Sequence, residues 1–550
     1  MPSSLTTFDF IVVGGGTAGC ALAARLSEDA RVTVCLLEAG GMDSHAFVRI
    51  PAAVMAAIGR ASLNWGFETT PQAALNGRRI PVPRGHVLGG SGSINGMVYH
   101  RGYPRDYDDW ARAGATGWSY SEVLPYFTRS ENNENYSASA YHGRGGPMNV
   151  RLPAQPNRMT RDFIDAVRTL DFPACADFCS SNPEGVGLRQ ATIRNGRRDS
   201  TARAFLRPAL ARANLTLLTG SRARRILFAG KRAVGVELVR AKELQRLSAQ
   251  REVILTMGAI QTPQLLLCSG IGDSAELARF GITVVHHLPG VGRNLHDHLA
   301  APVRMKTSST VPYGLSLRTL PRGMWNLVEY AVTAKGPLSS NVFESVAFLR
   351  TDPKLDRPDF QFVFQPSNRA TPEVPMPIGH GFAISPVLLY PKSRGRLSID
   401  SPDPFAPPLI DPGLLSNPED LPPLVRAVQL CRHILGAAPF ARYHATEVAP
   451  GPDVRTVEQI GEFIRATAST VHHPVGTCRM GTDSAAVVDP TLRVIGLDGL
   501  RVADASIFPS LMGGNTNAPT VMVAERAADF LRNLPARATS DPDRVASVNV

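Results

Sequence analysis

The pattern of apolar and polar residues near the start of the chain predicts a strand, a helix and a second strand. Residues 8–13 (FDFIVV) are mostly apolar and short enough for a buried strand. Three consecutive glycines follow, and residues 17–28 are rich in Ala and Leu, as expected of a helix. A second apolar run, 32–37, ends at Glu38. This order predicts a βαβ unit and a parallel sheet covered by helices.

The middle of the chain has a different pattern. Residues 131–160 are rich in Asn, Ser, Gly and Pro, which predicts an excursion from the core. Residues 352–424 are rich in Pro and contain strand-like fragments at 359–364 and 395–399. Such a composition favours an antiparallel sheet with long loops.

The last part of the chain returns to the first pattern. Residues 500–504 (LRVAD) predict a strand, and residues 519–532 predict a helix that tolerates Pro519 in its first turn. From Pro535 onward the chain is polar, and we expect this tail to be disordered.

Composition narrows the class of protein. The 550 residues are 43% hydrophobic and 19% charged, a balance that supports a large globular core. The formal charge of +11 indicates either a basic enzyme surface or attraction to acidic lipid or another anionic partner. Because no block of about five or six consecutive Lys and Arg residues is present, we expect no nucleic-acid partner.

The seven cysteines and the N-terminus bear on the compartment. An odd number of scattered cysteines predicts no disulfide framework, and the pair Cys175 and Cys179 has no second pair with which to form a metal site. The N-terminus lacks a secretory signal, and no apolar run is long enough to span a bilayer. We therefore expect a cytoplasmic protein without metal, with peripheral membrane contact on the cytoplasmic face left open.

The glycine turn carries a candidate nucleotide site. Residues 14–19 contain G-x-G-x-x-G between a predicted strand and helix, and an acidic residue closes the next strand. In such a turn the glycines permit a tight bend, close approach of a pyrophosphate, and close packing of helix on strand. The helix N-terminus attracts the phosphates, and the acidic residue accepts hydrogen bonds from ribose. The predicted contacts are Gly14, Gly16, Thr17, Ala18, Gly19, Glu38 and Ala39.

Several longer segments carry a family resemblance. Residues 85–99 (GHVLGGSGSINGMVY) and 258–272 (GAIQTPQLLLCSGIG) resemble the two signature segments of the glucose–methanol–choline oxidoreductases. The stretches HHPVGTCRMG (472–481), VADASIFP (502–509) and GNTNAPTVMVAERAAD (514–529) resemble the same family. The resemblance runs from about residue 8 to residue 533 in the same order.

The resemblance implies FAD as the cofactor. Further flavin contacts are then expected at Leu88, Gly89, Gly90, Ser91, Asn95, Gly96, Met97, Ala223, Asp504, Ala505, Asn515 and Thr516. His86 departs from the family, which usually has Arg, Lys or Asn there. Ile94 stands where some relatives carry a histidine bonded to the flavin, and it predicts non-covalent FAD.

The resemblance also implies a catalytic pair, His473 and Asn515. An alkoxide is a better hydride donor than an alcohol, so a base at the hydroxyl lowers the barrier. Imidazole suits that task near neutral pH, and the Asn515 amide can donate a hydrogen bond to the same oxygen. The hydride is expected to reach flavin N5. His472, directly before the base, is expected either to shape the pocket or to point away.

The substrate side favours an uncharged aliphatic or aromatic primary alcohol. Choline-oxidising relatives carry a glutamate where this chain has Ala300, so choline is disfavoured unless Glu344 compensates. Phe343 and Phe348 can form an apolar wall, although ordinary core packing is the better explanation for both. The electron acceptor is expected to be a quinone, or another acceptor that is not NAD. The alternatives are an oxygen-using alcohol oxidase, a choline dehydrogenase, and a flavin-dependent lyase or decarboxylase of the same fold.

The expected fold is α/β (α+β overall), with a Rossmann-like FAD-binding domain interleaved with a substrate domain of antiparallel sheet and helices. The FAD-binding domain is expected at 1–155, 196–300 and 465–535, and the substrate domain at 156–195 and 301–464, followed by a tail at 536–550. The active site is expected where the two domains meet. The sequence leaves the oligomeric state open.

Overall fold

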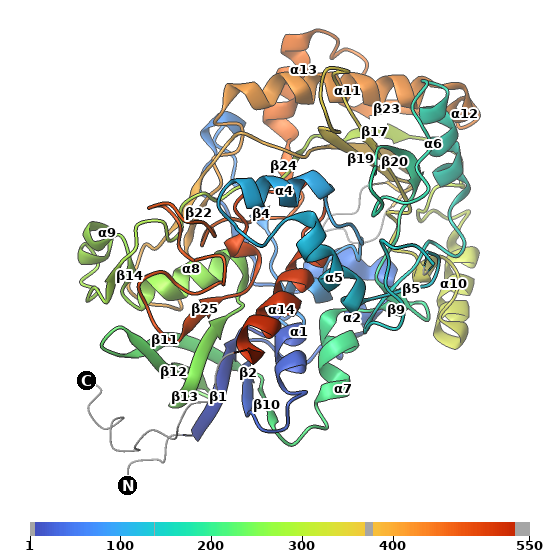
Figure 1. The fold of residues 1–550 in the computed structure, drawn as a ribbon. Helices are drawn as coiled ribbons and strands as arrows, with labels where there is room; N and C mark the ends of the chain where they lie inside the picture. Colours follow the sequence, from blue (N-terminus) through green and yellow to red (C-terminus); the bar gives the residue numbers. More distant parts are fainter. Residues whose placement is uncertain (1–5, 137, 369–377, 534–550) are drawn as a thin grey trace.

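The N-terminal βαβ unit forms the centre of the first sheet. The structure is a computed structural model that describes residues 6–136, 138–368 and 378–533. Strand β1 (Thr6–Val13) pairs in parallel with β2 (Val34–Leu37) and with the long β13 (Glu243–Leu255). Helix α1 (Thr17–Leu26) connects β1 to β2 (Figure 1). The prediction of a parallel sheet here is therefore confirmed, with the helix two residues shorter than expected.

Segments far apart in the sequence complete this sheet. β10 (Leu215–Leu218) pairs in parallel with β2, and β25 (Leu500–Val502) pairs in parallel with β13, which confirms the predicted C-terminal strand. β11 (Ser221–Ala229) and β12 (Arg232–Arg240) extend the other edge in antiparallel fashion. The sheet thus joins the beginning, the middle and the end of the chain.

The second sheet is antiparallel, as the Pro-rich composition predicts. Its strands run in the order β23 (Thr446–Ala449), β17 (Val303–Lys306), β20 (Gly381–Leu388), β19 (Phe360–Gln365), β18 (Ser345–Leu349) and β7 (Gly185–Leu188). The short β16 (Leu299–Ala300) also pairs with β20, and β24 (Ser469–Thr470) pairs with β16. Helices α6 (Arg158–Arg168), α11 (Leu421–Gly436) and α13 (Val457–Thr467) lie on the same side of the molecule (Figure 1). Phe360, Phe362 and Phe364 are fully buried beneath them.

Most of the remaining elements are short. They are α2 (Ala46–Arg49), α3 (Val54–Ile58), β3 (Phe67–Glu68), β4 (Pro81–Val82), α4 (Pro104–Arg112), α5 (Tyr120–Ser130), β8 (Ile193–Arg194), β9 (Arg197–Arg198), α7 (Arg207–Ala209), α8 (Gly258–Cys268), β14 (Ile271–Gly272), α9 (Ser274–Ala278), β15 (His286–His287), α10 (Leu320–Thr333), β21 (Arg396–Ser398), β22 (Leu409–Asp411) and α12 (Ala438–Ala441). In the described residues, no helix is both long enough and apolar enough to cross a bilayer. All seven cysteines are unpaired.

Two apolar cores alternate along the chain, one beneath each sheet. Leu75 and Ile80 join the core of the antiparallel sheet, although they precede residue 155. Leu397 and Ile410 join the core of the first sheet, although they lie between 301 and 464. The domain boundaries given above remain predictions, and the tail at 536–550 lies outside the described residues.

The expectation that residues 131–160 leave the core is wrong for part of that segment. β5 (Glu131–Asn133) pairs with β6 (Met148–Val150), and Met148 and Val150 belong to the core of the first sheet. The Glu131 carboxylate is fully buried, forms an ion pair with Arg101 and contacts His142 Nδ1. Buried charges are tolerated when they are paired in this way, and polar composition alone does not reveal the partner.

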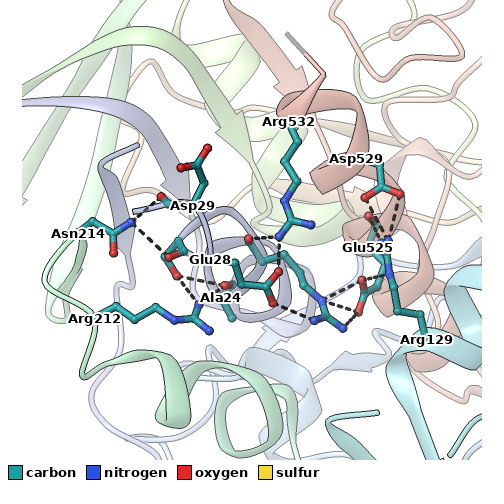
Figure 2. A network of polar contacts seen from close by, with 11 residues as sticks. Ala24, Glu28, Asp29, Arg129, Arg212, Asn214, Glu525, Asp529 and Arg532 are labelled. Atoms are coloured by element: carbon teal, nitrogen blue, oxygen red, sulfur yellow. Dashed lines mark hydrogen bonds and ion pairs between the residues drawn. The ribbon is translucent and has the colours of Figure 1, made fainter. Parts of the chain in front are cut away.

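Helix α14 (Asn517–Arg532) packs against α1, so the two ends of the chain meet. Figure 2 shows the polar network along this contact, with Glu525 among its labelled residues. The Glu525 carboxylate has no exposed surface and forms ion pairs with Arg25 of α1 and Arg129 of α5, each at 2.8 Å. Arg129 also bonds Asp529 one turn further along α14. These contacts fix the positions of α1 and α14 relative to each other.

Candidate active site

Glycine permits the close packing of the first turn. Gly14 has φ +105°, and a Cβ there would lie 2.9 Å from Met257 Cα. A Cβ on Gly19 would lie 1.9 Å from the Gly14 carbonyl oxygen. Both contacts involve backbone atoms, which cannot move aside, so larger residues are excluded at both positions. Gly19 lets α1 approach β1 closely, as the fingerprint predicts.

The N-termini of α1 and α14 face the same place and suit a pyrophosphate. The residue preceding each helix, Gly16 and Thr516, makes no capping hydrogen bond through a side chain, and neither first turn contains an acidic residue. The Thr17 hydroxyl donates a hydrogen bond of 3.1 Å to Asn517 Oδ1, which joins the two termini. Free N–H groups and the positive ends of two helix dipoles attract an anion. Ala18, in the first turn of α1, is buried. Sequence analysis missed Asn517, although it lies only two residues after Asn515.

Glu38 occupies the place expected of a ribose acceptor, at the end of β2. Its side chain is buried, and Oε1 accepts a 2.6 Å hydrogen bond from Gly40 N–H. Burial raises the pKa of Glu38 to about 7. Ala39 is the next residue in the chain. Ala223 lies on β11, and the same strand is joined to Glu38 by a hydrogen bond from the Ser221 N–H to the Glu38 carbonyl. A hydroxyl donor from a bound ribose would stabilise the ionised form of Glu38.

The second glycine turn packs its backbone on the first. Gly89 (φ +86°) donates a 2.7 Å hydrogen bond to the Gly15 carbonyl, and a Cβ on Gly90 would lie 2.8 Å from Gly16 Cα. Leu88 is buried. The Ser91 hydroxyl accepts a hydrogen bond from the N–H of Gly85, so it holds the turn together. The two turns thus form one glycine cradle beside the N-terminus of α1.

Residues 94–97 form a strained bend that a buried arginine supports. Arg198 Nη1 donates to the carbonyl and to the side-chain oxygen of Asn95, at 2.6 and 2.7 Å. Met97 follows with φ +57°, a conformation that non-glycine residues rarely adopt. A Cβ on Gly96 would lie 3.0 Å from the Phe343 ring, so glycine allows this aromatic residue to approach. Burial lowers the pKa of Arg198 to about 9.

Ile94 and Asp504 make protein contacts. Ile94 is buried in a separate apolar cluster with Val48 and Leu63. The Asp504 carboxylate accepts hydrogen bonds from the N–H of Gly258, at 2.8 Å, and from the Thr262 hydroxyl, at 2.6 Å. Asp504 therefore joins the start of α8 to the segment that follows β25.

His473 is held by contacts on every side of its ring and backbone. Its N–H donates a 2.7 Å hydrogen bond to Asp297 Oδ1. Its Nδ1 lies 2.9 Å from Nδ1 of His298, and its Nε2 lies 3.1 Å from Nδ2 of Asn515. The predicted pair, 42 residues apart in the sequence, is thus in direct contact, and His298 is a partner that sequence analysis did not identify.

These contacts select one tautomer of His473. His298 Nε2 lies 3.1 Å from the carbonyl oxygens of Leu389 and Met512, so it carries the proton. Neutral His298 then accepts at Nδ1, which requires His473 to donate from Nδ1. His473 Nε2 is therefore left with its lone pair, next to the Asn515 amide. A base with its lone pair at Nε2 is ready to take a proton.

Burial keeps this base neutral. Burial, followed by the neighbouring His298, holds the pKa of His473 well below its ordinary value, and burial lowers the pKa of His298 to about 4. His472 adopts φ +69°, and its carbonyl accepts a 2.6 Å hydrogen bond from Arg84 Nη2. The backbone before the base is therefore strained and fixed, as is common at active sites.

Glu344 and Phe348 form interior contacts. Glu344 has no exposed surface, and its carboxylate accepts hydrogen bonds from four donors: Asn157 N–H, the Thr160, Tyr313 and Ser340 hydroxyls, at 2.6–3.0 Å. Phe348 is fully buried and stacks on His100, which matches the core-packing interpretation. Phe343 remains beside Gly96. Glu344 is already occupied by protein donors and does not offer a free counter-charge.

Arg189 brings a positive charge to the substrate side. It is 3% exposed, and its guanidinium lies 5.8 Å from the centre of the Phe343 ring. Its Nε donates to the Phe343 carbonyl at 3.2 Å. Burial lowers the pKa of Arg189 to about 9, which leaves it charged at neutral pH. Its charge also contributes to the low pKa of His473.

Comparisons with known proteins match almost the whole chain. Two family models described as GMC oxidoreductase match residues 8–300 and 391–524. An alcohol dehydrogenase [acceptor] of Pseudomonas putida is 42% identical over 526 residues, 95% of each chain. An oxygen-dependent choline dehydrogenase of Rhizobium etli is 42% identical over 528 residues, again 95% of each chain.

Solved structures agree with this match. The crystal structure of pyridoxine 4-oxidase from Mesorbium loti has a TM-score of 0.87 and 33% identity, covering 96% of this chain and 100% of that chain. A formate oxidase of Aspergillus oryzae, whose structure concerns FAD modification, has a TM-score of 0.89 and 26% identity, covering 96% and 98%.

Proposed function

The chain belongs to the GMC oxidoreductases, and on that premise we propose that it oxidises an alcohol to an aldehyde or ketone with FAD. The observation that carries the proposal is the contact of His473 Nε2, shortly after β24, with the Asn515 amide, just before α14. Bound FAD supplies the hydride acceptor. The glycine cradle, the two helix N-termini and Glu38 suit its pyrophosphate and ribose.

The protein side of the reaction is a proton transfer. The lone pair of His473 Nε2 takes the proton of the substrate hydroxyl. Nε2 has one lone pair, so once it carries the proton it no longer accepts from Asn515, and the Asn515 amide can then donate to the substrate oxygen, where negative charge develops. The resulting imidazolium still donates the hydrogen bond from its Nδ1–H group to Nδ1 of His298. Asp297, bonded to the backbone of His473, fixes the position of the ring.

An anaerobic screen tests this reaction directly. Mixing the oxidised holoenzyme with primary alcohols in the absence of oxygen should bleach the flavin absorbance at one equivalent of substrate. Aliphatic and aromatic primary alcohols form the test set, and choline is the charged comparison. If no alcohol bleaches the flavin, while a cyanohydrin is cleaved or a fatty acid loses CO₂ under light, the lyase or decarboxylase alternative replaces this one.

The charges around the base favour an uncharged alcohol over choline. Arg189 is buried and Arg84 is partly buried, and both charges lower the pKa of His473, so a trimethylammonium group beside the base would meet two like charges. Ala300 offers no carboxylate, and Glu344 is occupied. Choline dehydrogenase remains the second candidate, because a relative of that name is 42% identical over nearly the whole chain. In the anaerobic screen we expect choline to reduce the flavin far more slowly than a neutral alcohol of similar size.

The acceptor is proposed to be a quinone or another acceptor other than NAD. The name of the Pseudomonas putida relative supports an acceptor of this general kind. Reoxidation of the reduced enzyme by a soluble quinone, compared with air-saturated buffer, separates a dehydrogenase from an oxidase. Release of hydrogen peroxide at the rate of turnover would favour the oxidase.

We also expect the FAD to be bound without a covalent link. Ile94 has no nucleophilic atom and packs in its own apolar cluster. Acid or urea denaturation followed by filtration should therefore release all the yellow chromophore into the filtrate. Chromophore that stays with the denatured chain, and migrates with it in an electrophoresis gel, would contradict this expectation.

A further inference from the structure

Helix α10 exposes its apolar side to solvent. It lies at the periphery of the molecule (Figure 1) and contains no buried residue. Trp325 is 65% exposed and Val332 is 80% exposed. Its other exposed apolar residues are Leu320, Met324, Leu327 and Val328. Soluble proteins rarely collect so many large apolar side chains on one exposed element, and such patches mark interaction sites.

The orientation of α10 is the reverse of that of an ordinary surface helix. At 100° per residue the exposed apolar side chains share one face. The opposite face carries Gly323, Asn326 and Tyr330, which are partly buried against the protein. The Tyr330 hydroxyl donates a 3.0 Å hydrogen bond to the Gly196 carbonyl. The polar face of the helix is therefore attached to the protein, and the apolar face is turned outward.

Neighbouring residues enlarge the apolar face and add positive charge. Leu317, just before the helix, is 92% exposed. Ile378, which forms an isolated β-bridge with Leu315, is 70% exposed. Exposed basic residues at 318, 322 and 335 flank them. Residues 306–343 include four basic residues and one acidic residue, Glu329. Apolar side chains with Trp among them and a basic margin are the composition of helices that lie in the headgroup region of anionic bilayers.

We propose that α10, with Leu317 and Ile378, docks the enzyme on the surface of an anionic lipid bilayer. A second copy of the chain is a poorer occupant. A helix of 14 residues is about 21 Å long and about 10 Å wide. Its outer face thus covers a few hundred Å², below the roughly 800 Å² per partner of a stable protein interface. A basic margin would also repel itself across a symmetric contact.

The docking surface is connected to the flavin side of the site. The chain that leaves α10 reaches Asn341, whose Nδ2 donates a 2.8 Å hydrogen bond to the Gly96 carbonyl. Phe343, two residues later, contacts Gly96 as described above. Docking through α10 would therefore bring a lipid-soluble acceptor or substrate to the side of the molecule on which residues 334–343 run from α10 to Gly96. The docking itself does not depend on the proposed reaction.

Vesicle binding tests the proposal with the holoenzyme. Flotation with vesicles of equal parts phosphatidylcholine and phosphatidylglycerol should recover the protein, and vesicles of phosphatidylcholine alone should bind at least tenfold less. The test variant combines Leu317→Gln, Met324→Gln, Trp325→Gln and Val328→Gln. It should bind the anionic vesicles at least tenfold less than the unchanged protein does. The matched control, Met42→Gln, Leu244→Gln, Val448→Gln and Val457→Gln, removes exposed apolar residues elsewhere and should bind as the unchanged protein does.

A spectroscopic measurement locates the contact. Trp110 and Trp118 are fully buried, and Trp65 is partly buried with the Arg222 guanidinium over its ring, so brominated lipids in the vesicles should quench mainly Trp325. Trp325→Phe should keep vesicle binding and lose the quenching. Thermal unfolding should be unchanged in all variants, and alcohol oxidation with a soluble dye should be unchanged without lipid. Absence of anionic-vesicle binding, equal loss in both fourfold variants, or conversion of a dimer to a monomer by the α10 variant alone would overturn the proposal.

Discussion

Replacing His473 by Ala should slow reduction of the flavin by alcohol roughly 10²- to 10⁴-fold, the usual contribution of a general base. The structure leaves Nε2 of this ring as the proton acceptor next to the Asn515 amide, whereas His298 contacts the other ring nitrogen, Nδ1. Stopped-flow mixing under anaerobic conditions measures the reduction rate apart from acceptor use. Because the alanine leaves a cavity, added imidazole should restore part of the rate.

The pH dependence of the same step has a defined sign. His473 works in its neutral form, and burial holds its pKa well below the ordinary value. The rate should therefore stay constant as pH falls through 6.5 and decline only at lower pH. In the alanine variant this acidic limb should disappear. His433→Ala, which removes an exposed histidine of α11, is the control and should retain the full rate. Unchanged reduction in His473→Ala would exclude this residue as the base.

The elements of the first sheet were predictable because their local pattern and their tertiary role agree. Residues 8–37 alternate between buried strand and Ala-rich helix, and both periods are visible in the sequence. The segment 131–150 was not predictable in the same way. Glu131 and His142 read as surface residues, yet Arg101, 30 positions before Glu131, makes their burial possible. Such compensation depends on a contact between segments, and sequence periodicity does not contain it.

The residues of the candidate site also fall into two groups, those that a local motif identifies and those that depend on contacts between distant segments. His473, Asn515 and the glycines stand in motifs, so the resemblance identifies them. Their supporting partners differ. Arg198 stands in a segment without a motif of its own, whereas His298 lies two residues before Ala300, in a segment that resembles the family but does not reveal which side chain contacts the base. Glu344 shows the opposite error, because a carboxylate in a loop suggests a counter-charge, whereas four donors already surround it. Whether a polar group faces a substrate or the protein is decided by packing.

Replacing Glu525 by Ala should lower the free energy of unfolding by about 3 kcal/mol, the scale seen when one partner of a buried ion pair is removed. The variant leaves Arg25 and Arg129, 18% and 35% exposed, without their shared carboxylate. Since these contacts join α1 and α14, the loss should also weaken FAD retention. In a urea titration, far-UV circular dichroism measures unfolding, and flavin fluorescence measures FAD release, because released flavin fluoresces more strongly.

A surface ion pair provides the comparison for Glu525. Glu462 is 73% exposed and lies 3.9 Å from Arg465 on α13, so Glu462→Ala should change the unfolding free energy by less than about 0.5 kcal/mol. The loss of unfolding free energy in Glu525→Gln should lie between those of Glu525→Ala and Glu462→Ala, because the amide oxygen can still accept a hydrogen bond from one arginine. If Glu525→Ala unfolds at the same urea concentration as Glu462→Ala, the network does not hold the two helices together. The alignment of their N-termini would then rest on apolar packing and on the Thr17–Asn517 hydrogen bond.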